Sequence, residues 1–186
     1  MHGVAADKLG DPTARYAGRL TLNPLPHLDP FGSILLPILL AFSGSPFLFG
    51  WAKPVPYNPF NLTKSRKYGE AIVAGAGPAA NYAIALVCAL IIQLGIFGSI
   101  NDVLFLVVVI NIMLGTFNLI PIPPLDGSKV LTAFLPLGAR MGYERFRAQL
   151  EHNPFLGMGI VLLVVLLFGN AIGSFIYGIA RLIAGI

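Results

Sequence analysis

The ionisable side chain best placed to do chemistry in this 186-residue sequence is the carboxylate of Asp126. It directly follows the uncharged stretch 103–125, which is long enough to cross a membrane, and an unpaired carboxylate at membrane depth is costly. Prolines at 121, 123 and 124 break this stretch and free backbone carbonyls, which is tolerated only beside protein or a wet cavity. The pattern favours a functional carboxylate. The alternative is a structural role, since a carboxylate near a helix start is favourable.

The histidines and the single cysteine are the other side chains of metal-binding type. His2 is a candidate ligand, although a lone terminal histidine is more often solvated. His27 lies in a proline-rich loop, and His152 precedes Asn-Pro at an expected membrane-surface turn. Cys88 lies inside an apolar stretch and is interpreted as helix packing, so neither an intrachain disulfide nor a thiolate metal cage is possible.

The composition places these residues in a membrane protein. Charged residues make up 11% of the chain, whereas soluble domains carry roughly 25%, so a soluble enzyme is excluded. Four uncharged stretches, 30–52, 71–101, 103–125 and 152–180, are each long enough to cross the hydrocarbon core. The lysines and arginines flank these stretches, as membrane orientation requires, and we expect no nucleic-acid partner. The sequence predicts an α-helical polytopic, multi-pass protein of the cell membrane.

Loop charge and helix breakers refine this fold class to three or four membrane helices. Segments 50–70 and 126–152 are rich in Lys and Arg and are predicted to be cytoplasmic, whereas 95–102 has neither and is predicted to be external. Segment 7–30 also prefers the cytoplasm. A stretch whose two flanking segments are both cytoplasmic cannot cross the membrane a single time. Residues 31–49 are therefore predicted to be a re-entrant segment that turns near 43–46. A full crossing is the alternative.

The shorter segments are expected to position the polar residues. Residues 2–10 are typical of the last turns of a helix that stops at Leu-Gly-Asp-Pro. Residues 15–22 show weak strand character, and the proline-rich segment 53–58 is compatible with an edge strand. The fold class therefore includes short extended or β segments.

Six motifs follow one another along the chain. They are His2-Gly3, Leu9-Gly-Asp-Pro12, Asn23-Pro-Leu-Pro-His-Leu-Asp-Pro30, Gly50-Trp-Ala-Lys-Pro-Val-Pro56, Ala76-Gly-Pro-Ala-Ala-Asn81 and Asn118-Leu-Ile-Pro-Ile-Pro-Pro-Leu-Asp-Gly127. In this order they resemble the site-2 protease family of intramembrane zinc metalloproteases, of the peptidase M50 type and in its small prokaryotic form. The resemblance covers nearly the whole chain, and the loop that ends in Leu-Asp-Gly is its most specific part.

The resemblance implies a Zn²⁺ cofactor held by the two histidines of a His-Glu-x-x-His motif and by the aspartate of Leu-Asp-Gly. Histidines four residues apart share a helix face, and the intervening Glu acts as general base. His2 matches the second histidine, and Asp126 matches the aspartate. Asn118 matches a family asparagine that could contact the substrate or steady the oxyanion. The implied substrates are transmembrane proteins, cut within their membrane segments.

The chain departs from the family at its start, because the first histidine and the glutamate would fall before Met1. We therefore expect residues 1–186 to be a single metalloprotease core that lacks most of its first membrane helix through truncation, with no proteolysis and weak zinc binding as written. One alternative is a non-catalytic membrane protein that binds transmembrane segments. Another is a transporter or channel component with Asp126 and Asn118 lining a polar path. No oligomeric state follows from the sequence.

Overall fold

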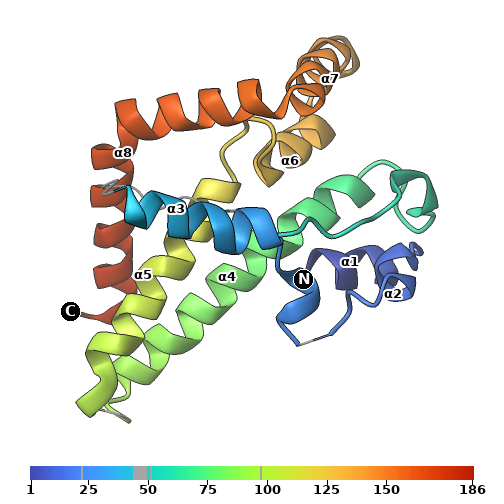
Figure 1. Ribbon diagram of the computed structural model, residues 1–186. Helices are drawn as coiled ribbons and strands as arrows, with labels where there is room; N and C mark the ends of the chain where they lie inside the picture. The colour runs from blue at the N-terminus through green and yellow to red at the C-terminus, as the bar shows by residue number, and fades with distance from the viewer. Residues whose placement is uncertain (22, 44–49, 51, 97) are drawn as a thin grey trace. The chain divides into compact units, whose positions relative to one another are not determined.

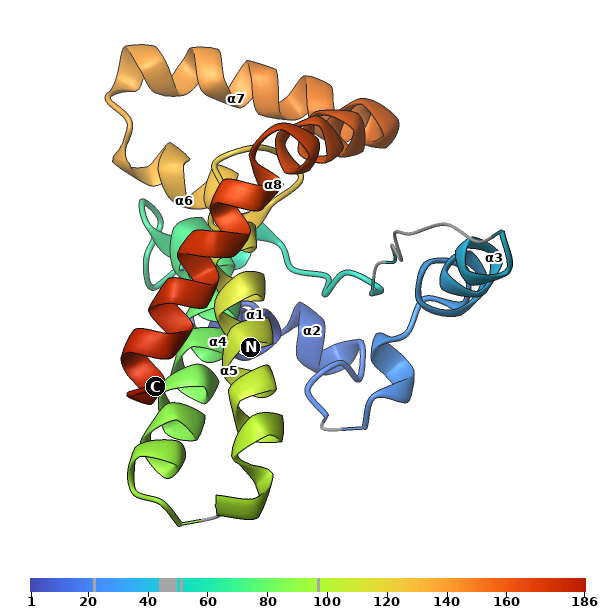
Figure 2. The same ribbon diagram turned by 90° about the vertical axis from the view of Figure 1, so that its left-hand side faces the viewer.

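The computed structural model describes residues 1–21, 23–43, 50, 52–96 and 98–186, and all regular elements among them are helical. The chain divides into an N-terminal unit, His2–Gly69, and a C-terminal unit that comprises Glu70–Ile186 together with Met1. Figures 1 and 2 show the course of each unit. The units are described separately below.

The N-terminal unit is built from short helices because prolines and glycines interrupt it repeatedly. Helix α1 ends where the sequence predicts, and Gly10 follows it with φ 110°, a conformation that favours glycine. The elements of this unit are α1 (His2–Lys8), α2 (Thr13–Tyr16), η1 (Leu25–His27), η2 (Pro30–Leu35), α3 (Leu36–Phe42) and η3 (Pro59–Asn61).

The predicted β segments are wrong for the part of the chain that the structure describes. Residues 13–16 form helix α2, so the expected strand at 15–22 begins inside a helix. Residues 52–58 form no regular element and pair with no strand among the described residues. The physical reason is that Pro54 and Pro56 lack the N–H donors of a β-ladder, while the Lys53 N–H donates to the His27 carbonyl at 3.0 Å.

The apolar stretch 31–49 is helical through its first part. Helices η2 and α3 form one apolar run, Pro30–Phe42, which is shorter than a membrane span. Ser43 caps this run, and its hydroxyl donates to the Leu40 carbonyl at 2.9 Å. The turn predicted near 43–46 falls mainly on residues 44–46, which lie outside the described residues, so the re-entrant hairpin stays a prediction.

The C-terminal unit confirms the three expected membrane helices. Three helices are long and apolar enough to cross a membrane: Gly69–Gln93, Gly98–Asn118 and Phe155–Ala184. The last corresponds to the uncharged stretch 152–180. The elements are α4 (Gly69–Gln93), η4 (Gly98–Ile100), α5 (Asn101–Asn118), α6 (Asp126–Phe134), α7 (Leu137–His152) and α8 (Pro154–Ala184).

The core of the C-terminal unit lies where α4, α5 and the second half of α8 meet (Figure 2). Small side chains on α4 and α8 allow close helix approach. The Gln93 side-chain amide donates to the Ile183 carbonyl at 2.7 Å, so α4 and α8 end side by side. Helices α4 and α8 therefore run in the same sense, as alternating membrane crossings require. The buried members of this core are Ala85, Ala89, Ile92, Val108, Ile112, Ile176, Ala180 and Ala184.

Candidate functional site

Asp126 is the first residue of α6 and follows the loop 119–125, which begins where α5 ends at Asn118. The N-cap position belongs to Leu125, which makes no side-chain capping bond. The Ser128 hydroxyl instead closes this turn by donating to the Leu125 carbonyl at 2.7 Å. Asp126 thus lies at a helix start, where the backbone dipole favours a carboxylate. The structure brings Asn118 and Asp126 to the two ends of one short loop.

Close packing explains why the Leu-Asp-Gly motif ends in a glycine, Gly127. A Cβ built on Gly127 would overlap the backbone carbonyl of Leu119 and lie 2.6 Å from the Ile120 carbonyl oxygen. Both obstacles are backbone atoms, which cannot move aside as a flexible side chain can. The first turn of α6 therefore packs directly on the end of α5, and this contact sets the position of the neighbouring Asp126.

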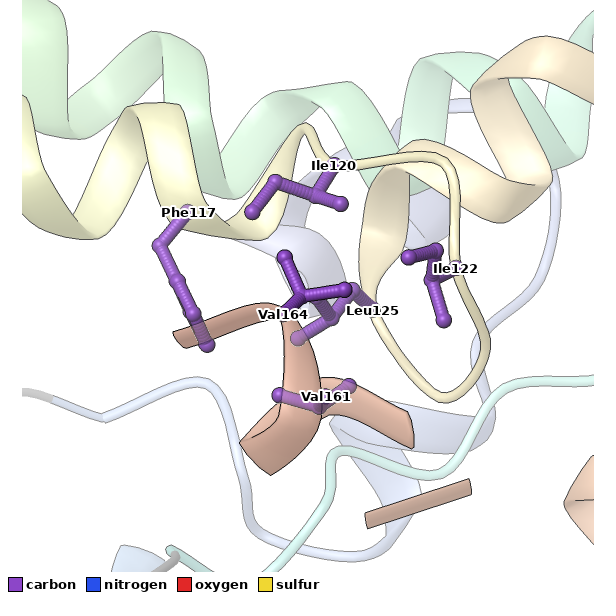
Figure 3. A pocket seen from close by; sticks show the side chains of 6 residues that line it. All are labelled: Phe117, Ile120, Ile122, Leu125, Val161 and Val164. Atoms are coloured by element: carbon purple, nitrogen blue, oxygen red, sulfur yellow. The ribbon is translucent and has the colours of Figure 1, made fainter. Parts of the chain in front are cut away.

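Apolar side chains anchor the other side of the loop to α8. Figure 3 shows six of them converging around a small hollow from the end of α5, the loop and the first half of α8. The loop can lie at membrane depth because these side chains cover one face of its backbone. The lining residues are Phe117, Ile120, Ile122, Leu125, Val161 and Val164.

Hydrogen bonds within the unit reach several carbonyls of the proline-bearing loop. The Ile122 N–H donates to the Ile120 carbonyl at 2.8 Å, and the Leu125 N–H donates to the Ile122 carbonyl at 2.9 Å. The Pro121 carbonyl accepts from the Tyr143 hydroxyl of α7 at 2.8 Å. The loop thus folds back on itself, and α7 supplies a donor to the Pro121 carbonyl.

Tyr143 is a site residue that sequence reasoning missed. It lies in α7, and nothing in the local sequence pattern shows that it reaches a loop residue 22 positions earlier. Burial raises the pKa of Tyr143, and the opposing charge of Arg147 lowers it by less. The phenol therefore stays protonated and able to donate at neutral pH.

Asn118 is the last residue of α5, and its side-chain Nδ2 donates to the Leu114 carbonyl at 2.8 Å. Asn111 makes the same bond to its own helix, to Val107 at 2.9 Å. Each amide uses one of its two N–H groups in this way and retains the second. An amide N–H at the end of a membrane helix can hold a carbonyl oxygen of a bound peptide.

His2 is the first residue of α1, in the N-terminal unit, and it is half-buried. His2 and Asp126 therefore belong to different units. Imidazole and carboxylate are both donors that zinc accepts, so their chemistry fits the metal. Among the described residues no three His, Cys, Asp or Glu side chains are grouped to hold a metal ion. His2 and Asp126 therefore stay predicted ligands.

Asp11, which sequence analysis treated only as a helix-stop residue, is fully buried with 0% exposure. Its carboxylate accepts from Thr13, from the Asn58 N–H at 2.6 Å and from the Asn61 amide at 3.1 Å. Burial by itself would raise the pKa of Asp11, but these hydrogen bonds outweigh it, and the pKa is lowered. Asp11 ties the end of α1 to the segment around η3.

Comparison with known proteins identifies the family. A family model described as Peptidase family M50 matches residues 96–166, which contain Asn118 and Asp126. The chain is 37% identical over 185 residues to the candidate zinc metalloprotease YwhC of Bacillus subtilis, covering 94% of this chain and 76% of that protein. It is 34% identical over 112 residues to the zinc metalloprotease MJ0392 of Methanocaldococcus jannaschii, covering 58% of this chain and 30% of that protein.

A third relative is the candidate zinc metalloprotease Rip2 of Mycobacterium tuberculosis, 29% identical over 182 residues, covering 96% of this chain and 64% of that protein. The chain spans less than two thirds of the length of MJ0392 and of Rip2. No solved structure matches the chain. The similarity to YwhC over nearly the whole chain, together with the family match around Asp126, shows that the chain belongs to peptidase family M50, the site-2 protease family of zinc metalloendopeptidases.

Proposed function

We propose that this protein is the core of a zinc-dependent intramembrane endopeptidase that cleaves the transmembrane segments of membrane-protein substrates. The observation that supports it best is the loop 119–125, which presents Asp126 at the end of a membrane-length helix. Packing from α6, α7 and α8 holds that loop, so the carboxylate has a defined position. Family membership supplies the reaction class, and the three apolar helices favour the cell membrane as its location.

His2 and Asp126 would hold the zinc ion, which when bound activates water and polarises the peptide carbonyl. The remaining histidine and the glutamate of the motif would be supplied by sequence that precedes Met1. The nucleotide sequence before Met1 tests this: in-frame His-Glu codons support the protease, whereas a stop codon immediately upstream favours a non-catalytic protein that binds transmembrane segments.

Asn118 would hold the carbonyl oxygen of the scissile bond with its second amide N–H. The substrate must be extended there, because peptide bonds inside a helix are shielded. Segment 53–58 is a platform on which substrate could add by a few main-chain hydrogen bonds, since Pro54 and Pro56 lack N–H donors. The region around helices η2 and α3 would gate entry from the lipid. Photocrosslinkers placed in these two segments should capture a bound substrate. Failure to capture any would refute both roles.

Replacement of Asp126 by alanine tests the metal assignment. In the protein encoded with its upstream codons, Asp126→Ala should abolish both zinc binding and cleavage of a membrane substrate. The matched control is Asp102→Ala, which removes an exposed carboxylate from the first turn of α5 and should leave both unchanged. Cleavage by Asp126→Ala at the normal rate would show that the ligand assignment is wrong.

A further inference from the structure

Arg19 is a buried cation in the N-terminal unit, with 6% of its surface exposed. Its Nη2 group donates to two consecutive carbonyls of a distant segment, Lys53 at 2.6 Å and Pro54 at 3.2 Å. Its Nε atom is buried without a hydrogen-bond partner. Within the part of the chain that the structure describes, no carboxylate forms an ion pair with Arg19.

Burying an arginine without a partner carboxylate is energetically unfavourable. Removing a guanidinium from water is unfavourable, two carbonyl acceptors compensate for only part of that cost, and the unpaired Nε adds to it. An apolar side chain would fill the same volume without this penalty. The role of Arg19 is therefore best explained by the position in which it holds the carbonyls of Lys53 and Pro54.

Those carbonyls lie directly before a contact with the first turn of α1. A Cβ built on Gly3 would be 3.1 Å from Val55 Cγ1 and 2.9 Å from Leu20 Cδ2. Leu20 follows Arg19 in the chain, and Val55 follows Pro54. The guanidinium thus joins two of the segments that surround Gly3, the third contact being Ala14 Cβ of α2 at 3.0 Å. Gly3 is the neighbour of His2.

We propose that Arg19 is a positioning residue for metal binding, which fixes the first turn of α1, and with it the His2 imidazole, by clamping the segment 53–55 to the turn at 19–20. The proposal rests on the proposed function, in which His2 is a zinc ligand. Pro54 and Pro56 stiffen the clamped segment, so a displacement at Lys53 is carried to Val55 rather than absorbed locally. Groups that orient a metal ligand without touching the metal commonly influence affinity strongly.

The test measures zinc affinity by competition with a chromophoric chelator, in the protein encoded with its upstream codons. Arg19→Met should weaken zinc binding about 10- to 100-fold. The matched control is Arg15→Met, which removes a mostly exposed arginine that also contacts α1, through Asp7. Arg15→Met should leave the affinity unchanged. Equal losses in the two variants would overturn the proposal, because they would indicate general destabilisation of the unit.

Two further variants separate positioning from stability. Val55→Ala should weaken zinc binding by itself, and the double variant Arg19→Met with Val55→Ala should lose no more affinity than Arg19→Met, because both changes act through one contact. Additive losses would overturn the proposed route. If Arg19→Met fails to fold, Arg19→Lys replaces it in the same comparison, since an ammonium can still donate to one of the two carbonyls and should keep part of the affinity.

The His2→Ala variant distinguishes an error in the role of Arg19 from an error in the zinc site. If His2→Ala binds zinc as tightly as the parent protein, the assignment of His2 is wrong and the proposed function loses a ligand. If His2→Ala loses zinc while Arg19→Met binds it normally, only the role of Arg19 is refuted. Hydrogen exchange of the α1 amides provides a second readout: Arg19→Met should accelerate exchange in α1 and leave α4, α5 and α8 unchanged.

Discussion

Gly127 lies so close to the carbonyl of Leu119 that no side chain fits between them. The contact joins the first turn of α6 to the end of α5, across the loop that carries the prolines. It places Asp126 by packing backbone against backbone, which leaves little freedom for adjustment. The glycine after the aspartate is thus a steric requirement of the site as well as a sequence motif.

Gly127→Ala should therefore displace the loop and destabilise the C-terminal unit. Overpacking of a tight site costs about 1–3 kcal/mol, and here the obstacle is backbone, so we expect the upper end of that range. Thermal unfolding in detergent measures the loss, and zinc affinity of the protein encoded with its upstream codons should fall with it. Gly75→Ala is the control, since its Cβ would meet only Val130 Cγ2, at 4.0 Å. A normal melting temperature for Gly127→Ala would contradict the packing described here.

Asn118→Ala should slow catalysis without changing the affinity for zinc. Loss of one oxyanion donor lowers kcat by about 10²- to 10³-fold, while zinc affinity and KM should stay close to the parent values. Single-turnover cleavage of a membrane substrate measures this. Asn111→Ala is a matched control, because Asn111 makes the same bond to its own helix, two turns earlier. Equal losses of kcat in the two variants would refute a specific role for Asn118.

Tyr143→Phe should loosen the loop by removing one hydrogen bond and nothing else. The Pro121 carbonyl would lose its donor, at a cost of about 0.5–1.5 kcal/mol. We expect lower zinc affinity and faster hydrogen exchange in residues 119–127. Tyr177→Phe, at a ring packed edge-on against Phe105, is the control and should leave both unchanged. Unaltered exchange in Tyr143→Phe would show that the phenol does not hold the loop.

Asp11 should make the N-terminal unit less stable at acid pH than at neutral pH. The folded pKa of Asp11 lies below its ordinary value of 3.8, so the carboxylate contributes stability above that pH. The contribution is lost as the pH falls through the lowered folded pKa. Hydrogen exchange of the α1 amides, followed from neutral to acid pH, should show this loss.

Asp11→Asn should reduce that acid dependence and lower stability at neutral pH, by about 1–3 kcal/mol for a disrupted buried hydrogen-bond network. Asp7→Asn is the control, because Asp7 pairs with a mostly exposed arginine and such pairs contribute about 0–1 kcal/mol. A neutral-pH stability of Asp11→Asn equal to that of the parent would contradict the role assigned to the buried carboxylate.

Local sequence features predicted the membrane helices, the end of α1 and the family. Each depends on residues that are neighbours in the chain: an uncharged run of sufficient length, a Gly-Asp-Pro stop, or the Leu-Asp-Gly loop. The β segments failed for the same reason. Strand propensity at 15–22 and 53–58 is local, whereas a strand exists only when a second segment completes its hydrogen-bond ladder.

The tertiary structure decided which distant residues support the site. Nothing near Tyr143 in the sequence indicates Pro121 as its partner, and nothing near Arg19 indicates Lys53. The sequence by itself determined that Asp126 follows a membrane-length helix, because hydrophobicity and chain breaks act along the chain. Only the fold determined that a glycine, a phenol and a buried guanidinium hold the segments around the candidate ligands, because such contacts depend on how helices pack in space.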